Sequence, residues 1–508
     1  MGILDKLRKE PDKKKEKILK KDSESEILDK YSVKVDEIEC EVFIVREGGF
    51  TYYRIPDVDK IYESLKELEK GNYFNLIKTQ ITDLGLVTYE QIRDYILNFS
   101  LRYDINIPNI DELAKFYYLL IGRLGLLEIP LNDPNLEEVM VNGYNHPVFV
   151  FHRKHQMCET NIVLDRNEVD RIIESIASLV NRTIDSRVPM LDAFLPDGSR
   201  VNATTSDICM NGATITIRKF SREPLTVIDL INFGTLDVDT AAFLWQAVEG
   251  YFGAKPANSL IVGGTGSGKT TLLNVLSLFS MYNERIITIE DTPELQIPHR
   301  HVIRLITRPA RPGMPEYEVT MDDLVKNALR MRPDRIFVGE VRGKEAYSLL
   351  VAMNTGHDGC SGTLHANSAD EAILRLLSPP MNVPPIMLNS LNFIINIQRI
   401  RRGGKTLRRI LGIIEVLPSG GETEIAKTTL YEYSATKDGL ERKGVCMWEE
   451  EVCEIAGISR EELFRDRNMR KRLLTYLYKN NIRKLEDVAK YIREFQINPE
   501  NALKKLTS

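Results

Sequence analysis

A glycine-rich stretch, residues 263–270, has the residue types and the spacing of a phosphate-binding loop, G-x-x-x-x-G-K-[ST]. In such a loop, successive backbone N–H groups point at phosphate oxygens, a lysine reaches the β- and γ-phosphates, and a hydroxyl can ligate Mg²⁺. Here Lys269 is the lysine and Thr270 is the hydroxyl. The stretch predicts that the chain binds a nucleoside triphosphate with Mg²⁺. The candidate contacts are the residues of the stretch and the one that follows it: Gly263, Gly264, Thr265, Gly266, Ser267, Gly268, Lys269, Thr270 and Thr271.

Three further polar side chains stand where a hydrolysis site needs them. Glu290 and Glu340 each close an apolar run, and a carboxylate at the end of a strand can orient or deprotonate the water that attacks the γ-phosphate. The long side chain of Glu340 favours contact with Mg²⁺ through a bound water, so Thr270 and Glu340 are the candidate Mg²⁺ ligands. His365 could donate to a phosphate oxygen and report the γ-phosphate. Which glutamate is the general base stays open. The alternative to a catalytic role is a solvated carboxylate for each glutamate and a packed or surface position for the histidine.

The elements around these residues are predicted to form a mostly parallel sheet. Residues 259–262 are typical of a short buried strand that enters the loop, and residues 269–276 have the apolar spacing of a helix whose N-terminus faces the anion. Strands are also predicted over residues 285–289, 335–338 and 393–397, alternating with helices. This alternation favours helices on both faces of the sheet, and the carboxyl ends of such strands meet at the ligand crevice.

Composition and charge limit the class of protein. The chain has 508 residues, which suggests about three domains. Its 68 Lys and Arg against 73 Asp and Glu give a net charge of −5, which argues against a protein that coats nucleic acid. It has no apolar run approaching the ~18–20 residues of a membrane span, and its six cysteines include no C-x-x-C pair for structural zinc. We therefore predict a cytoplasmic protein whose membrane contact is peripheral.

Shifts in composition divide the chain into five predicted segments. Nine Lys and Arg lie among residues 6–21, and this basic tail fits either a solvated segment or one that contacts anionic lipid or an acidic partner. The predicted segments are a basic tail (1–32), a first N-terminal domain (33–108), a second N-terminal domain of α+β class (109–223), the ATPase core (224–448) and a charged helical C-terminal region (449–508).

A cluster of arginines is predicted to mark the tip of a β-hairpin. Arg399, Arg401 and Arg402 precede two glycines, and Arg408 and Arg409 follow them. Contact with nucleic acid would normally come with interleaved aromatic side chains, which this cluster lacks. A subunit interface and a solvated tip are the alternatives that remain for it.

Five segments, in order along the chain, resemble the Walker A, Asp box, Walker B and His box of the type II/type IV secretion ATPase superfamily (GspE-like). They are residues 263–270, 289–294, 329–335, 338–342 and 363–367. Upstream, residues 195–202 and 215–220 look like that family's second N-terminal domain. Residues 141–144 and 379–384 resemble its archaeal branch, which includes the archaellum motor and archaeal pilus and secretion ATPases. The likeness runs from about residue 130 to about residue 418, over half of the chain.

The resemblance implies a fold, partners and two further site residues. It implies an α/β protein in which a RecA-like P-loop ATPase domain follows a small N-terminal domain and an α+β, PAS-like second domain. It implies a homo-oligomeric ring, a hexamer, with ATP and Mg²⁺ bound between the N-terminal and ATPase domains and with no nucleic acid. Arg200 and Arg218 would then reach the triphosphate, where a guanidinium neutralises charge on the transferred phosphoryl group. An ordinary surface or structural role is the alternative for each.

Three functions follow from these observations. The first is a Mg²⁺-dependent ATP-hydrolysing motor that works with a polytopic membrane platform protein on the cytoplasmic side of the membrane. It would power assembly of an archaeal pilus-like or archaellum filament, or type II-like secretion. The second is a nucleic-acid translocase or helicase with a RecA-like core, against which the net acidity and the missing aromatic-lined basic stripe count. The third is a nucleotide-gated assembly hub in which hydrolysis is incidental.

Overall fold

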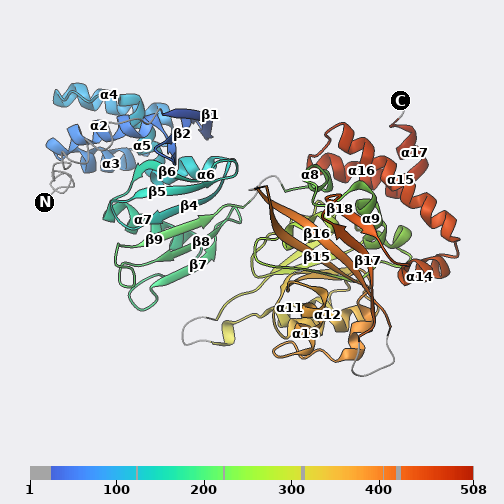
Figure 1. Ribbon diagram of the computed structural model, residues 1–508. Helices are drawn as coiled ribbons and strands as arrows, with labels where there is room; N and C mark the ends of the chain where they lie inside the picture. The colour runs from blue at the N-terminus through green and yellow to red at the C-terminus, as the bar shows by residue number, and fades with distance from the viewer. Residues whose placement is uncertain are drawn as a thin grey trace. The chain divides into compact units, whose positions relative to one another are not determined.

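The computed structural model describes residues 25–121, 124–220, 224–310, 315–403, 405–418 and 425–506. These residues form two compact units that divide between residues 222 and 223 (Figure 1). Each unit has its own nine-stranded sheet and its own buried apolar core. Among the described residues, no helix is both long enough and apolar enough to cross a membrane.

Unit 1 is built on one sheet that runs through both predicted N-terminal domains. Its strand order is β1-β2-β3-β6-β5-β4-β9-β8-β7, and the parallel pairing of β3 with β6 joins the two halves. Helices cover this sheet and bury their apolar stripes against it. The elements are β1 (Glu26–Val35), β2 (Ile38–Glu47), β3 (Phe50–Arg54), α2 (Pro56–Lys70), α3 (Tyr73–Asp83), α4 (Tyr89–Tyr103), α5 (Ile110–Leu120), η2 (Gly125–Leu127), α6 (Glu128–Asn132), β4 (Leu136–Asn142), β5 (Pro147–His152), β6 (Gln156–Val163), α7 (Arg166–Leu179), β7 (Met190–Phe194), β8 (Arg200–Thr204) and β9 (Thr214–Arg218).

The start of β1 shortens the predicted basic tail. The strand begins at Glu26, within the segment 1–32 that composition assigns to the tail, and alternate residues such as Val33 and Val35 are buried in the core. Successive side chains of a strand point to opposite faces of the sheet, so one face can be buried although the other carries charged residues. Residues 1–24, which hold the basic run, lie outside the described residues.

Unit 2 is a RecA-like α/β domain built on a mostly parallel sheet. The strand order is β12-β11-β13-β14-β10-β15-β16-β17-β18, and the pairings from β12 to β15 are parallel. The strands predicted over residues 259–262, 285–289, 335–338 and 393–397 are confirmed as β10, β11, β13 and β15. The strands are β10 (Ser259–Gly263), β11 (Ile286–Glu290), β12 (Val302–Ile306), β13 (Arg335–Val341), β14 (Ser361–His365), β15 (Phe393–Arg402), β16 (Lys405–Val416), β17 (Lys427–Ser434) and β18 (Gly439–Arg442).

Helices cover both faces of this sheet, as predicted (Figure 1). Alternate residues of β10 show why, since Ile261 packs into the core beneath α9 and α10, while Leu260 and Val262 pack beneath α11, α12 and α13. Strands buried on both faces are expected to be apolar throughout, and all five residues of β10 are buried. The helices of this unit are α8 (Val227–Asn232), α9 (Val238–Gly253), α10 (Lys269–Ser277), η3 (Pro315–Tyr317), α11 (Met321–Ala328), α12 (Glu345–Asn354), α13 (Ala369–Leu377), η4 (Pro385–Ser390), α14 (Met447–Ala456), α15 (Arg460–Lys479), α16 (Leu485–Ile497) and α17 (Pro499–Lys504).

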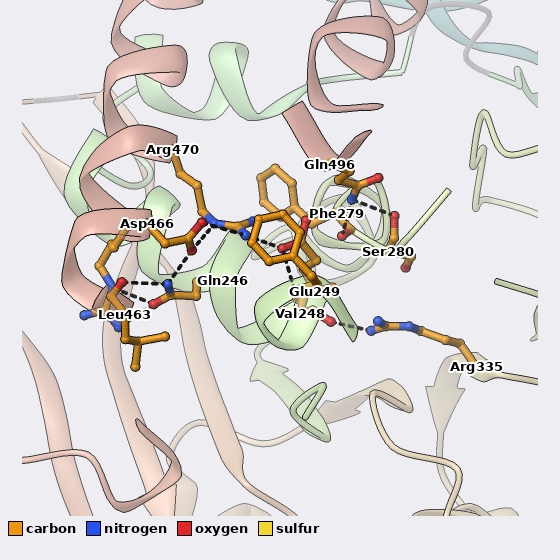
Figure 2. A network of polar contacts seen from close by, with 12 residues as sticks. Gln246, Val248, Glu249, Phe279, Ser280, Arg335, Leu463, Asp466, Arg470 and Gln496 are labelled. Carbon is orange, nitrogen blue, oxygen red and sulfur yellow. Dashed lines mark hydrogen bonds and ion pairs between the residues drawn. The ribbon is translucent and has the colours of Figure 1, made fainter. Parts of the chain in front are cut away.

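The C-terminal helices belong to the ATPase unit because a buried polar network ties them to α9 (Figure 2). Arg470 of α15 is fully buried and forms ion pairs with Glu249 of α9 and with Asp466, the latter at 2.8 Å. Gln246 of α9 donates to the same Asp466 at 2.6 Å. Two charges removed from water are stabilised only when good geometry and further hydrogen bonds compensate their desolvation. The Asp466 carboxylate has such further bonds, whereas Glu249 Oε1 and Arg470 Nη1 have no hydrogen-bond partner among the described residues.

A second set of contacts in the same region reaches the helix that follows the phosphate loop. Gln496 of α16 donates to the carbonyls of Phe279 and Ser280, just after α10, at 3.2 and 3.1 Å (Figure 2). On the other side of α9, Arg335 at the start of β13 donates to the Val248 carbonyl. The C-terminal helices, α9, α10 and β13 are therefore held as one framework.

Replacing Arg470 with methionine should strongly destabilise unit 2. The change would leave the buried carboxylates of Glu249 and Asp466 without their cation, which costs about 3–5 kcal/mol of unfolding free energy. The matched control is Lys471→Met, because Lys471 pairs at the surface with Asp239, whose side chain is 71% exposed. That pair should contribute at most about 1 kcal/mol. Urea unfolding followed by tryptophan fluorescence reports on this unit alone, since the chain's two tryptophans, Trp245 and Trp448, both lie in it. Equal losses in the two variants would contradict the network's role.

Candidate nucleotide-hydrolysis site

The phosphate loop connects β10 to α10, as the sequence predicts. β10 ends at Gly263, and α10 begins at Lys269. Two glycines are needed for this turn: Gly268, at the N-cap of α10, has φ +97°, and a Cβ on Gly263 would lie 2.2 Å from the Ile397 carbonyl oxygen. The unpaired N–H groups at the start of α10 therefore face the loop, which is the arrangement that binds phosphate.

Lys269 and His365 meet at this loop from different elements. The Lys269 ammonium donates to the Gly264 carbonyl at 3.1 Å. Burial lowers the pKa of Lys269, and the charge of Glu340 opposes that shift. His365 is the last residue of β14 and lies opposite Gly263 in the parallel register, so that its Nε2 is 3.2 Å from the Thr265 hydroxyl. The register of two strands thus brings the predicted histidine to the loop.

Glu290 is buried at the end of β11. The residue is only 2% exposed, and its Oε1 accepts hydrogen bonds from the backbone N–H groups of Glu294 and Leu295 at 2.9 and 3.0 Å. Burial raises the pKa of Glu290 to about 7, although both hydrogen bonds lower it. Gly339 on the neighbouring β13 leaves room for this side chain, since a Cβ there would lie 3.0 Å from the Glu290 Cγ. A carboxyl that titrates near neutral pH can exchange a proton with water at little cost.

Glu340 lies on β13, which is not adjacent to the strand that leads into the loop. β13 is separated from β10 by β14, and Glu340 follows Gly339 at the carboxyl end of β13. Its carboxylate forms an ion pair with Arg342 at 2.8 Å, and Arg342 also reaches Asp291 at 3.3 Å. Arg342 was not among the residues predicted from the sequence. The one hint in the sequence is that this arginine lies two residues after Glu340.

Amide side chains form another part of the loop's surroundings that sequence reasoning missed. Gln398 of β15 accepts the Gly264 N–H at 3.4 Å and donates to the Asn367 carbonyl at 3.0 Å. Asn396, two residues earlier, donates to the same carbonyl. These bonds hold the residues after β14 against the loop. No sequence signal marks them, because a polar residue late in a strand is usually at the surface.

Arg200 and Arg218 lie next to each other in the sheet of unit 1. They are direct cross-strand partners at the start of β8 and the end of β9, and both are exposed. Arg200 forms an ion pair with Asp192 at 2.7 Å. Their predicted contact with the triphosphate stays a prediction.

The side chains at the loop fit a magnesium nucleotide. The loop N–H groups and Lys269 suit the phosphates, while the Thr270 hydroxyl in the first turn of α10 and the Glu340 carboxylate are oxygen ligands of the kind Mg²⁺ takes. Gly263 cannot carry a side chain, because a Cβ there would lie 2.2 Å from the Ile397 carbonyl oxygen and 2.4 Å from Ser267 Oγ of the loop. Lys269, Thr270, Glu340 and His365 therefore fit as one candidate site, with Glu290 beside it.

Replacing Glu290 with glutamine should stabilise unit 2 at alkaline pH. The folded carboxyl has a pKa of about 7 against an ordinary 4.5, so the stability from its protonated form is complete below pH 4.5 and is lost as the pH rises through 7. Glutamine still accepts the two backbone N–H groups and never ionises. The unfolding free energy of the variant minus that of the wild type should increase by about 2 kcal/mol between about pH 5.5 and about pH 8. Urea unfolding with tryptophan fluorescence measures this difference. Glu432→Gln, at a side chain that is 64% exposed on β17, is the control, and a pH-independent difference for Glu290→Gln would refute the assignment.

Comparison with known proteins gives the chain a family. The family of type II/IV secretion system proteins matches residues 125–456. An uncharacterized protein of Methanocaldococcus jannaschii is 56% identical, covering 100% of this chain and 97% of its own length. The type IV secretion system protein VirB11 of Bartonella henselae is 31% identical over 49% of this chain and 78% of that protein. The crystal structure of the VirB11 ATPase from Brucella suis, in complex with sulphate, is 27% identical over 56% of this chain and 90% of that one, with a TM-score of 0.29. With more than half of its length matched, the chain belongs to the type II/IV secretion system protein family.

Proposed function

We propose that this chain is a Mg²⁺-dependent ATPase that works as a motor for secretion or filament assembly. The observation that carries the proposal is the meeting of Lys269, Glu340 and His365 at the carboxyl ends of neighbouring parallel strands. Membership of the type II/IV secretion system protein family supports a motor ATPase. The name of the B. henselae relative, a type IV secretion system protein, supports work on a secretion system.

In the proposed reaction, the residues of unit 2 divide the work on the triphosphate. The loop N–H groups and Lys269 would hold the phosphates, and His365, whose Nε2 contacts the Thr265 hydroxyl, would donate to the γ-phosphate. Thr270 and, through a water, Glu340 would hold Mg²⁺, which would neutralise charge on the phosphates. Glu290 takes the proton of the attacking water on its Oε2, because its Oε1 already accepts two backbone N–H groups. Arg342 orients the Glu340 carboxylate by pairing with it.

The wider assembly in this proposal is a homo-oligomeric ring, a hexamer, on the cytoplasmic side of the membrane. Arg200 and Arg218 of unit 1 would reach the triphosphate, and closure of unit 1 on unit 2 would be the mechanical output. The partner would be a polytopic membrane platform protein of an archaeal pilus, archaellum or type II-like secretion system, with no nucleic acid. The 56% identical archaeal relative is consistent with the archaeal branch.

Lys269→Ala and Glu340→Gln should each reduce Mg²⁺-dependent ATP hydrolysis by at least about 100-fold, since each removes charge stabilisation of the transferring phosphoryl group. Phosphate release with and without Mg²⁺ measures the loss. Glu432→Gln is the control, because this side chain is 64% exposed on β17 of the same unit. Wild-type turnover by Glu340→Gln would overturn the role of β13.

Two further readouts separate the motor from its alternatives. Single- or double-stranded DNA should leave the hydrolysis rate unchanged, and strong stimulation would favour a nucleic-acid translocase. Glu340→Gln should still bind ATP but fail to support filament assembly or secretion in cells. Complementation by this variant would favour a nucleotide-gated hub.

A further inference from the structure

Two arginines of the basic hairpin lie directly opposite each other beside the phosphate loop. β15 and β16 form the predicted hairpin, and Arg399 pairs across it with Arg408. β15 is also parallel to β10, with Val262 opposite Asn396. Residues 398 and 399 of β15 therefore extend past the end of β10 and run alongside the loop that follows it.

Both guanidinium groups reach the loop itself. Arg408 Nε donates to the Gly266 carbonyl at 3.1 Å. A Cβ on Gly266 would lie 3.7 Å from Arg399 Nη1, and a Cβ on Gly268 would lie 3.4 Å from Arg408 Cδ. The arginines are thus in van der Waals reach of the glycines that shape the phosphate cradle.

Within the described residues, no carboxylate compensates the charge on this pair. Like charges directly opposite on neighbouring strands destabilise a sheet. Two other arginines of the hairpin, Arg402 and Arg409, pair with Asp438 at 3.4 and 2.9 Å. Across the described part of the chain, no carboxylate pairs with Arg399 or Arg408, and both side chains are exposed. Two guanidinium groups held together in this way suit a phosphate oxygen, which they can bind with several charge-assisted hydrogen bonds.

The sheet order decides which part of a nucleotide the pair would meet. β10 lies between β14 and β15. His365 and, beyond it, Glu340 lie on the β14 side, where the proposed γ-phosphate and Mg²⁺ belong, whereas Arg399 and Arg408 lie on the β15 side. A ligand that spans the loop presents its γ-phosphate to the first side and its α-phosphate to the second.

We propose that Arg399 and Arg408 form a second cation site that binds the α-phosphate of the nucleotide in the same subunit. The inference rests on the proposed binding of ATP and deepens it. Because ATP and ADP share the α-phosphate, the pair stabilises substrate and product equally. It thereby holds ADP after hydrolysis and slows product release.

Binding of ADP and of a non-hydrolysable ATP analogue, measured by calorimetry at low and at moderate salt, tests the site. Arg399→Gln should weaken both ligands about tenfold and to the same extent, since a charge-assisted hydrogen bond contributes that much. The effect should shrink as salt rises. Arg399 has no hydrogen bond or ion pair within the described part of the chain, so its loss should leave the tryptophan-detected unfolding midpoint unchanged. Arg399→Lys should restore part of the affinity.

The control is Arg401→Gln, an exposed arginine on the same face of β15 whose cross-strand partner is Thr406. It should bind both ligands as the wild type does. Weakening confined to the ATP analogue would place the pair at the γ-phosphate and overturn the assignment. Wild-type affinity in Arg399→Gln and in Arg408→Gln, while Lys269→Ala loses binding, would refute the pair but keep the nucleotide site. A wild-type protein that binds neither ligand would refute the proposed function itself.

Discussion

The parallel register of four strands in unit 2 is the constraint on which the site depends. In a parallel sheet, all carboxyl ends point to one edge, so side chains from distant segments arrive at the same place. Gly263 and His365 are opposite each other because β10 and β14 end in register, and Glu290 lies beside Gly339 because β11 pairs with β13. A shift of one residue in either pairing would turn these side chains to the other face of the sheet.

The two sides of the phosphate loop carry different polar groups. On the side of β14 and β13 stand His365 and the carboxylate of Glu340, and on the side of β15 and β16 stand Arg399 and Arg408. Lys269 lies in the first turn of α10. Carboxylates suit a bound cation and an attacking water, whereas guanidinium groups suit phosphate oxygens. A nucleotide that crosses the loop would therefore meet a different chemistry at each end.

The scaffold behind the loop extends beyond the segment that the family shares. The family match ends at residue 456, while Arg470 and Gln496 lie after it. Arg470 connects α15 to α9, and Gln496 binds the carbonyls that follow α10. Because these groups are buried, the bonds are not weakened by competition with water. The C-terminal helices thus hold the segment that directly follows the helix carrying Lys269.

Local patterns in the sequence determined the phosphate loop, the strands that carry Glu290, Glu340 and His365, and the hairpin of arginines. Each of these is encoded within a few consecutive residues, by glycine spacing or by apolar runs that end in a polar side chain. Tertiary structure decided the rest. Burial raises the pKa of Glu290, Arg342 comes between Glu340 and Asp291, and Arg408 reaches Gly266. It also decided that the C-terminal helices complete the ATPase unit and that one sheet runs through both predicted N-terminal domains. These features depend on the order and register of strands far apart in the chain, which no local periodicity specifies.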